Sequence, residues 1–247
     1  MDFQIEEIES LGSTNDYLFD IIAGGDVKEG KIIIARNQLK GKGTSNNKWE
    51  SEAGKNLTFS ILVKPDFIMA ENQFVITQIV SLALTNSLSC FLDEDKLKIK
   101  WPNDIYYSNG KLAGILIQNI IKGSTISHSV IGIGLNLNQE RFYSGAPNPV
   151  SMVQIANKTF DPKDVLKKIL ESFEENYYRF MLFPKTKWLE KSYLDKMFRF
   201  NNLSEFTENA RAFKGRIKGI DNYGRLIVIK QNGEEKFYGF KEIEFVI

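Results

Sequence analysis

The order of apolar and polar residues along the chain predicts strands and helices that interleave. Runs rich in β-branched or alternating apolar residues predict strands at residues 3–9, 31–36, 56–64, 97–101, 105–108, 111–120 and 125–137. Apolar residues at helical spacing predict helices that open at residue 13 and reach 22, and that cover 70–92, 162–182 and 185–197. We therefore expect a mixed β-sheet backed by helices, an α+β architecture.

The pattern of apolar and polar residues changes at about residue 206. Short apolar runs are then separated by turn signals at 221–224 and 231–233, as in a small barrel of hairpins. We expect two domains, 1–205 and 206–247, of which the second is a small β-barrel.

A long polar segment, residues 37–54, interrupts the predicted strands without any hydrophobic period. Long loops inside compact domains are usually functional or disordered. Here Gly41 and Gly43 would let the backbone approach a phosphate closely, and Lys40, Lys42 and Lys48 supply positive charge. The pattern is neither a Walker loop nor a complete dinucleotide-binding fingerprint. A basic surface loop without a ligand explains the same residues.

Composition excludes several classes of function. The net charge of +1 gives no general attraction to nucleic acid or to a membrane surface. Cys90 is the only cysteine and His128 the only histidine, which argues against disulfides, thiolate metal sites and Ser-His-Asp catalysis. No apolar run approaches the roughly 18 residues of a membrane span, and the first residues do not resemble a signal peptide. We expect a cytoplasmic protein without a membrane or nucleic-acid partner.

A second polar cluster lies between apolar runs at residues 98–114. The sequence Lys-Trp-Pro-Asn-Asp occupies 100–104, and Gly-Lys-Leu-Ala-Gly occupies 110–114. A turn explains Pro102 and Asn103, but not Trp101 between Lys100 and a carboxylate. Charged groups packed this closely need partners when they are buried, and a site for a charged ligand would supply them.

These two sequences together resemble the central motif of the biotin–protein ligases. The segment Gly-Lys-Gly-Thr-Ser-Asn-Asn-Lys-Trp at 41–49 resembles the family's G-R-G-R-x-G-x-x-W loop, and Ser-Thr-Asn at 13–15 follows the first strand as in that family. The resemblance covers nearly the whole chain and implies the class II synthetase-like catalytic fold with an SH3-like C-terminal barrel. No helix-turn-helix precedes the first strand, so we expect a monofunctional ligase rather than a DNA-binding repressor.

The resemblance implies a two-step reaction. ATP, with Mg²⁺ carried by its phosphates rather than by a metal site of the protein, activates biotin as biotinyl-5′-AMP, and a lysine of a biotin carboxyl carrier protein then receives the biotin. The carrier would belong to an acyl-CoA carboxylase. Members of the family occur as monomers and as homodimers.

The resemblance also assigns candidate residues by their match to the family's motifs. The catalytic candidates are Lys111, Asp104 and Lys42. Biotin would contact Ser13, Thr14, Asn15, Gln38, Gly41, Lys42, Lys111 and Gly114. ATP and the adenylate would contact Lys42, Gly43, Thr44, Trp49, Asn103, Lys111 and Asn136. Several of these have ordinary structural explanations: residues 13–15 suit a helix N-terminus, Trp49 could anchor the loop in the core, and Gly-x-Gly-x-Asn at 132–136 could be a strand end.

The glycine loop departs from the family pattern at three positions. Lys42 and Thr44 stand where arginines are usual, and Asn46 replaces a glycine. A lysine keeps the positive charge but loses the planar fork of arginine. These changes predict weaker retention of the adenylate or a different closure of the loop.

Three other functions remain open. A lipoate-type ligase or octanoyl transferase shares the catalytic fold, although Cys90 does not lie beside the glycine loop. A non-catalytic sensor of biotin or its adenylate would fit Thr44 and Asn46. A nucleic-acid module on the terminal barrel would use its basic residues, but acidic residues offset them.

Overall fold

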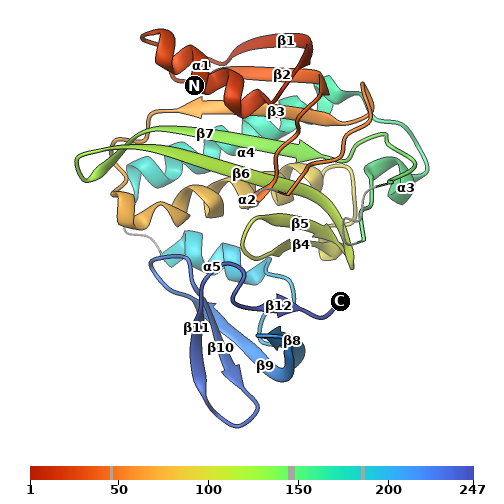
Figure 1. Cartoon of the computed structure of the whole chain (residues 1–247), viewed down its shortest axis with the longest axis vertical. Coiled ribbons are helices and arrows are strands. Elements are labelled where there is room, and N and C mark those ends of the chain that lie inside the picture. The colour runs from red at the N-terminus through yellow and green to blue at the C-terminus, as the bar shows by residue number, and fades with distance from the viewer. Residues whose placement is uncertain (45–46, 144–147, 185–186) are drawn as a thin grey trace.

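The computed structural model describes residues 1–44, 47–143, 148–184 and 187–247, which form a seven-stranded sheet and a separate five-stranded sheet (Figure 1). The larger sheet has the order β1-β2-β3-β7-β6-β5-β4. Its first two strands are parallel and all other neighbours are antiparallel. The strands are β1 (Gln4–Leu11), β2 (Lys31–Gln38), β3 (Leu57–Val63), β4 (Leu97–Lys100), β5 (Asp104–Tyr107), β6 (Gly110–Lys122) and β7 (Thr125–Leu135).

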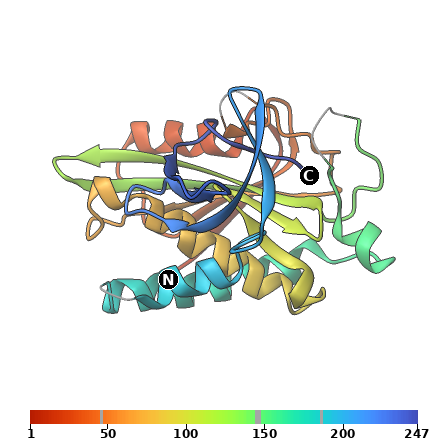
Figure 2. The ribbon, with the colours of Figure 1, turned by 90° about the horizontal axis from the view of Figure 1, so that it is seen from below.

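Helices cover both faces of this sheet. Figure 2 shows α1 on one face, with α2 and α4 on the other. The helices are α1 (Thr14–Gly24), α2 (Phe74–Leu88), α3 (Met152–Ala156), α4 (Pro162–Leu182) and α5 (Lys187–Asp195), with short 3₁₀ turns at η2 (Ala70–Asn72) and η3 (Glu94–Lys96). None of the helices in the described parts of the chain combines the length and apolar character needed to cross a membrane.

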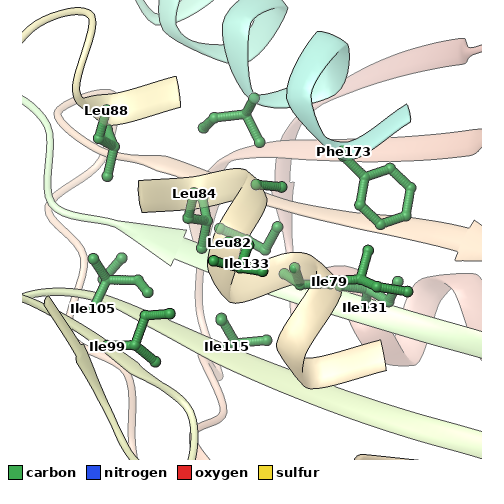
Figure 3. Packing of buried hydrophobic residues seen from close by; sticks show 14 of the residues in the cluster. Ile79, Leu82, Leu84, Leu88, Ile99, Ile105, Ile115, Ile131, Ile133 and Phe173 are labelled. Carbon is green, nitrogen blue, oxygen red and sulfur yellow. The ribbon is translucent and has the colours of Figure 1, made fainter. Parts of the chain in front are cut away.

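The main core lies between the sheet and α2. Ile79, Leu82 and Leu84 of this helix pack toward Ile131 and Ile133 of β7 (Figure 3), and all five side chains are buried. Because α4 covers the other side of α2, this helix has little exposed surface. The predicted helix at 70–92 is shorter in the structure: a separate 3₁₀ turn occupies Ala70–Asn72, and α2 ends at residue 88.

The five-stranded sheet has the order β11-β10-β9-β8-β12, and all its pairs are antiparallel. Its strands are β8 (Ser204–Glu208), β9 (Arg211–Ile220), β10 (Leu226–Lys230), β11 (Glu235–Tyr238) and β12 (Glu244–Phe245). The predicted small β domain is confirmed, but it is not a closed barrel. The short β12 pairs with β8 and does not reach β11, so two edges remain.

The β4–β5 hairpin is fixed against this second sheet. The indole of Trp101 is buried and donates a hydrogen bond of 2.8 Å to the carbonyl of Gly224. Gly224 has a positive φ of 83°, and a Cβ there would lie 2.5 Å from Phe74 of α2. Trp101 therefore has a structural role, which the turn sequence alone did not explain; the peptide bond between Trp101 and Pro102 is cis.

Candidate active site

The connection from β1 to α1 places Ser13 and Thr14 at the start of the helix. Ser13 precedes the helix but makes no side-chain capping bond. The carboxamide oxygen of Gln38, at the end of β2, accepts from the backbone N–H of Thr14 at 2.8 Å and from its hydroxyl at 3.1 Å. Strand β2 and the start of α1 are thus linked through one amide group.

Ser60 extends this link into a buried network. Its hydroxyl lies 2.7 Å from Thr14 Oγ1 and 2.6 Å from Asn15 Oδ1. The amide of Asn15 donates at 2.8 Å to Gln118 Oε1 and at 3.2 Å to the carbonyl of Leu116 on β6. Neither Ser60 nor Gln118 was predicted from the sequence. The available signal was a single serine between the apolar residues Phe59 and Ile61 of a predicted strand.

Residues 41–44 and 47–49 of the glycine loop pair with each other as the two arms of a small hairpin. Gly43 donates to the carbonyl of Asn47 at 2.7 Å, and Trp49 donates to the carbonyl of Gly41 at 3.0 Å. A Cβ at Gly41 would lie 2.6 Å from the carbonyl oxygen of Trp49, so the close approach requires glycine there. Asn46 lies outside the described residues.

The hairpin lays the indole of Trp49 on two glycines of the sheet. A Cβ at Gly134 would lie 2.4 Å from the indole, and one at Gly114 would lie 3.0 Å from it. The ammonium of Lys111 lies 5.7 Å from the ring centroid. The indole Nε1 is buried and finds no hydrogen-bond partner within residues 1–44, 47–143, 148–184 and 187–247.

An ion pair marks the β5–β6 side of the site. Lys111 Nζ lies 2.7 Å from Asp104 Oδ1, and the two side chains are 23% and 16% exposed. Asn103, in the turn between β4 and β5, joins that hairpin to β6. Its side-chain amide donates to the carbonyl of Ile115 at 2.7 Å, and its backbone carbonyl accepts from the Ile115 N–H at 2.9 Å.

Lys42, the third catalytic candidate, faces a different carboxylate. Its ammonium lies 2.7–2.8 Å from both oxygens of Asp16, in the first turn of α1. The two side chains are 50% and 46% exposed. This ion pair is therefore much closer to solvent than the pair of Lys111 and Asp104.

Most of the predicted site residues line one cavity. They come from the β1–α1 turn, the end of β2, the glycine loop and strands β5 to β7. These residues are Ser13, Thr14, Asn15, Gln38, Lys42, Gly43, Thr44, Trp49, Asn103, Lys111 and Gly114. Gly132 and Gly134 of the Gly-x-Gly-x-Asn segment also line it.

Three predicted residues lie outside this lining. Asp104 borders the cavity through its contact with Lys111. Gly41 lines a neighbouring hollow that shares Gln38, Lys42 and Trp49 with the cavity. The buried amide of Asn136 donates to the carbonyls of Lys111, at 3.3 Å, and of Val150, at 3.1 Å, so it holds the start of β6 in place.

Other potentially reactive groups lie elsewhere. Cys90 is exposed in the turn after α2 and does not line the cavity. Within the described parts of the chain, no three His, Cys, Asp or Glu side chains gather in a group that could hold a metal ion.

Comparison with known proteins agrees with the arrangement of both sheets. The profile of the Biotin/lipoate A/B protein ligase family matches residues 7–136, and that of the Biotin protein ligase C terminal domain matches residues 205–245. The structure of the biotin protein ligase from Aquifex aeolicus in complex with biotin and ATP superimposes with a TM-score of 0.79, at 24% identity and with full coverage of both chains. At this identity the likeness shows the shared fold.

Two curated relatives extend the comparison. The bifunctional ligase/repressor BirA of Bacillus spizizenii is 28% identical over 225 residues, which are 88% of this chain and 67% of the relative. The biotin–[acetyl-CoA-carboxylase] ligase of Paracoccus denitrificans is 30% identical over 149 residues, which are 57% of this chain and 60% of the relative. Because the first family profile spans more than half of the sequence, the chain belongs to the biotin/lipoate A/B protein ligase family.

Proposed function

We propose that this chain activates biotin with ATP and transfers it to a lysine of a biotin carboxyl carrier protein. In the first step, a carboxylate oxygen of biotin attacks the α-phosphorus of ATP, which forms biotinyl-5′-AMP and releases pyrophosphate. In the second step, the carrier's lysine amine attacks the acyl carbon, which forms an amide and releases AMP and a proton. Neither step needs a nucleophile from the enzyme.

One observation carries this proposal: a single cavity joins a buried network of amides and hydroxyls to a partly buried lysine. The ureido ring of biotin has one carbonyl acceptor and two N–H donors, which hydroxyl and amide groups of Thr14, Asn15 and Gln38 complement. Lys111 then supplies a fixed cation for the carboxylate at the other end of the molecule. The order of these groups matches a ligand with a polar ring and an acidic tail.

Lys111 is the residue to which we assign charge stabilisation in the first step. Its ammonium would leave Asp104 for the biotin carboxylate and the phosphate that this carboxylate attacks, where negative charge concentrates. A preorganised cation in a partly closed site stabilises such charge more than water does. Asp104, once released from Lys111, would lie close to the incoming amine of the carrier and could accept its proton.

The glycine loop would cover the nucleotide. Gly43 offers a backbone that can approach phosphate closely, Lys42 offers a positive charge, and Thr44 lies beside them in the cavity lining. We assign the indole of Trp49 to the wall between biotin and adenine. Closure of this loop would exclude water from the mixed anhydride, which water hydrolyses. Asn103 would contact the nucleotide from the β4–β5 hairpin. Asn136 would contribute indirectly, because it holds the start of β6 in place.

Mg²⁺ would enter with ATP. Oxygen ligands suit this ion, and in nucleotide sites it keeps several waters and binds mainly through the phosphates. The lining offers carboxamide and hydroxyl oxygens, and the carboxylates of Asp104 and Asp16 lie beside its lysines. These donors fit a metal held mainly by the phosphates of ATP. Bound there, Mg²⁺ neutralises phosphate charge.

The polar network also bears on the choice between biotin and lipoate. The dithiolane ring of lipoate has no N–H or carbonyl group, so it would offer no hydrogen bond to the hydroxyls and amides around Ser60. A site built for hydrogen bonding discriminates against an analogue that lacks those groups, because the analogue displaces water from the polar groups without replacing its hydrogen bonds. The polar network therefore favours biotin over lipoate.

Further parts of the proposal rest on the family. The carrier would be the biotin carboxyl carrier domain of an acyl-CoA carboxylase. We also propose a division into residues 1–205 and 206–247, a cytoplasmic location, and a monomer or homodimer as the working unit. The beginning of β8 at Ser204 and the C-terminal family match from residue 205 support the division.

The test is biotin-dependent exchange of labelled pyrophosphate into ATP by the purified chain, with lipoate and octanoate as parallel substrates. We expect exchange with biotin alone, followed by biotin transfer to a carrier domain. Exchange only with lipoate would replace the proposal with lipoate ligation. Biotin binding by calorimetry without any exchange would indicate a sensor.

A further inference from the structure

Lys100 lies where the β4–β5 hairpin meets the C-terminal sheet. Its ammonium is 5.3 Å from the ring centroid of Tyr106 on β5 and 4.9 Å from that of Phe245 on β12. These distances allow cation–π attraction to two rings from different sheets. Within the described ranges, no carboxylate oxygen comes within 4.0 Å of its Nζ. The ammonium is therefore held by aromatic rings and lacks an ion-pair partner there.

One carboxylate of the proposed site lies on the strand paired with Lys100. Lys100 and Asp104 are direct partners in the antiparallel register of β4 and β5, so their side chains project to the same face of the sheet. Burial lowers the pKa of Lys100, and the Asp104 carboxylate opposes that shift. The other charges that act on Lys100 are Lys111 and Arg199, which lower its pKa, and Glu244 of β12, which raises it.

Asp104 consequently lies between two lysines. It contacts Lys111 at 2.7 Å, while Lys100 stands across the hairpin without such a contact. If Lys111 moves to an anionic substrate, as the proposed function requires, Asp104 loses its close cation. A mostly buried carboxylate left alone is costly, so that movement would be opposed unless a second positive charge compensates.

We propose that Lys100 is a positioning residue that supplies this second charge: it compensates Asp104 while Lys111 serves the substrate, and Phe245 of the C-terminal sheet holds Lys100 in place. The inference rests on the proposed function and adds a residue to it. It also gives the C-terminal sheet a defined contribution to adenylate formation, because the aromatic ring at Phe245 comes from β12.

The central experiment compares Lys100→Met with the wild type in biotin-dependent pyrophosphate exchange. Methionine keeps much of the apolar stem and removes the charge. We expect a loss of about tenfold in the exchange rate, equivalent to about 1.4 kcal/mol. Lys100→Arg should recover most of the rate. Lys98→Met, on the same strand and without Asp104 as a register partner, is the matched control and should exchange like the wild type.

Two further measurements separate an electrostatic role from a merely structural one. In an Asp104→Asn background, Lys100→Met should cause no additional loss, because no carboxylate is left to compensate. The ratio of wild-type to Lys100→Met rates should also fall toward one as pH rises. The pKa of Lys100 is lowered, so the wild-type lysine becomes neutral below the ordinary titration range of lysine.

Phe245→Leu tests the contribution of the C-terminal sheet. We expect a loss in the same direction as Lys100→Met but smaller, because the charge remains and only its position is loosened. Wild-type exchange by Lys100→Met, an undiminished loss in the Asp104→Asn background, or a pH-independent ratio would each overturn the inference. Absence of exchange in the wild type would overturn the proposed function instead, so the two failures are distinguishable.

Discussion

The two sides of the cavity are built in different ways. On the strand side, Lys111 and Asp104 are 23% and 16% exposed and belong to strands paired within the sheet. On the loop side, Lys42 and Asp16 are 50% and 46% exposed, and a few backbone hydrogen bonds hold the glycine hairpin. The same kind of ion pair thus occurs once in a partly buried, rigid setting and once near solvent.

This contrast indicates where binding energy and adaptability reside. Charges on the strand side are screened little by water and should act strongly on a substrate. Charges on the loop side are screened more, and their geometry depends on a segment that can rearrange over a ligand. We therefore expect substitutions on the strand side to affect chemistry, and those on the loop side to affect retention.

The largest effect is expected for Lys111→Ala. Removal of this fixed cation should lower biotin-dependent pyrophosphate exchange by about 100- to 1000-fold, because negative charge develops next to it. Lys122→Ala, at the exposed far end of the same strand, is the control and should retain exchange. A circular dichroism spectrum would show that the fold is intact. Near-normal exchange by Lys111→Ala would remove its assigned role and erase the contrast between the two sides.

A smaller but distinct effect is expected for Ser60→Ala, beneath the polar network. Loss of the hydroxyl leaves Thr14 and Asn15 short of a partner, which should lower the free energy of unfolding by about 1–2 kcal/mol. The KM for biotin should also rise, while the KM for ATP stays nearly constant. Ser81→Ala is the matched control, since that buried hydroxyl has no hydrogen-bond partner in the described part of the chain. Equal responses of the two variants would contradict the network's role.

On the loop side, Thr44→Arg should slow the escape of the adenylate from the enzyme by about three- to tenfold. The added guanidinium can bind phosphate in a bidentate manner. Thr44→Gln adds length without charge and serves as the comparison. Single-turnover release, measured with labelled ATP and no carrier, gives the rate directly. Unchanged release would show that this position does not limit retention.

The smallest effect is expected for Asp16→Asn, which frees Lys42. Because the pair is about half exposed, the unfolding free energy should change by no more than about 0.5 kcal/mol. Exchange should stay within about twofold of the wild type. A large loss of either would mean that this exposed pair fixes the loop after all, and the two sides would then be alike.

Elements of the fold were predictable from the sequence where the burial of one face alone determines the order of apolar and polar residues. The helix α4 has the predicted bounds 162–182, because one face is apolar and the other polar. The five-residue α3 escaped prediction, since so short a segment carries no period. The openness of the C-terminal sheet could not be predicted either, because it depends on which strands β12 pairs with rather than on its own residues.

The candidate site was likewise predictable only in part. The motif at 100–104 and the loop at 41–49 pointed to residues that the structure brings to one cavity, although their roles remain predictions. Ser60 and Gln118 were missed because their importance arises from contacts between strands that are distant in sequence. Trp101 looked functional in sequence, and the structure gives it a hydrogen bond to Gly224 that joins the two sheets.

The position of Trp49 also gives the protein an optical reporter. The chain has three tryptophans. The indoles of Trp101 and Trp188 lie outside the cavity, one bonded to Gly224 and the other stacked 4.1 Å from the guanidinium of Arg179. Of the three, Trp49 alone lines the cavity; its Nε1 has no hydrogen-bond partner among the described residues, and the ammonium of Lys111 lies above the ring. Changes in intrinsic fluorescence on ligand addition would therefore follow the glycine loop itself, without any attached dye.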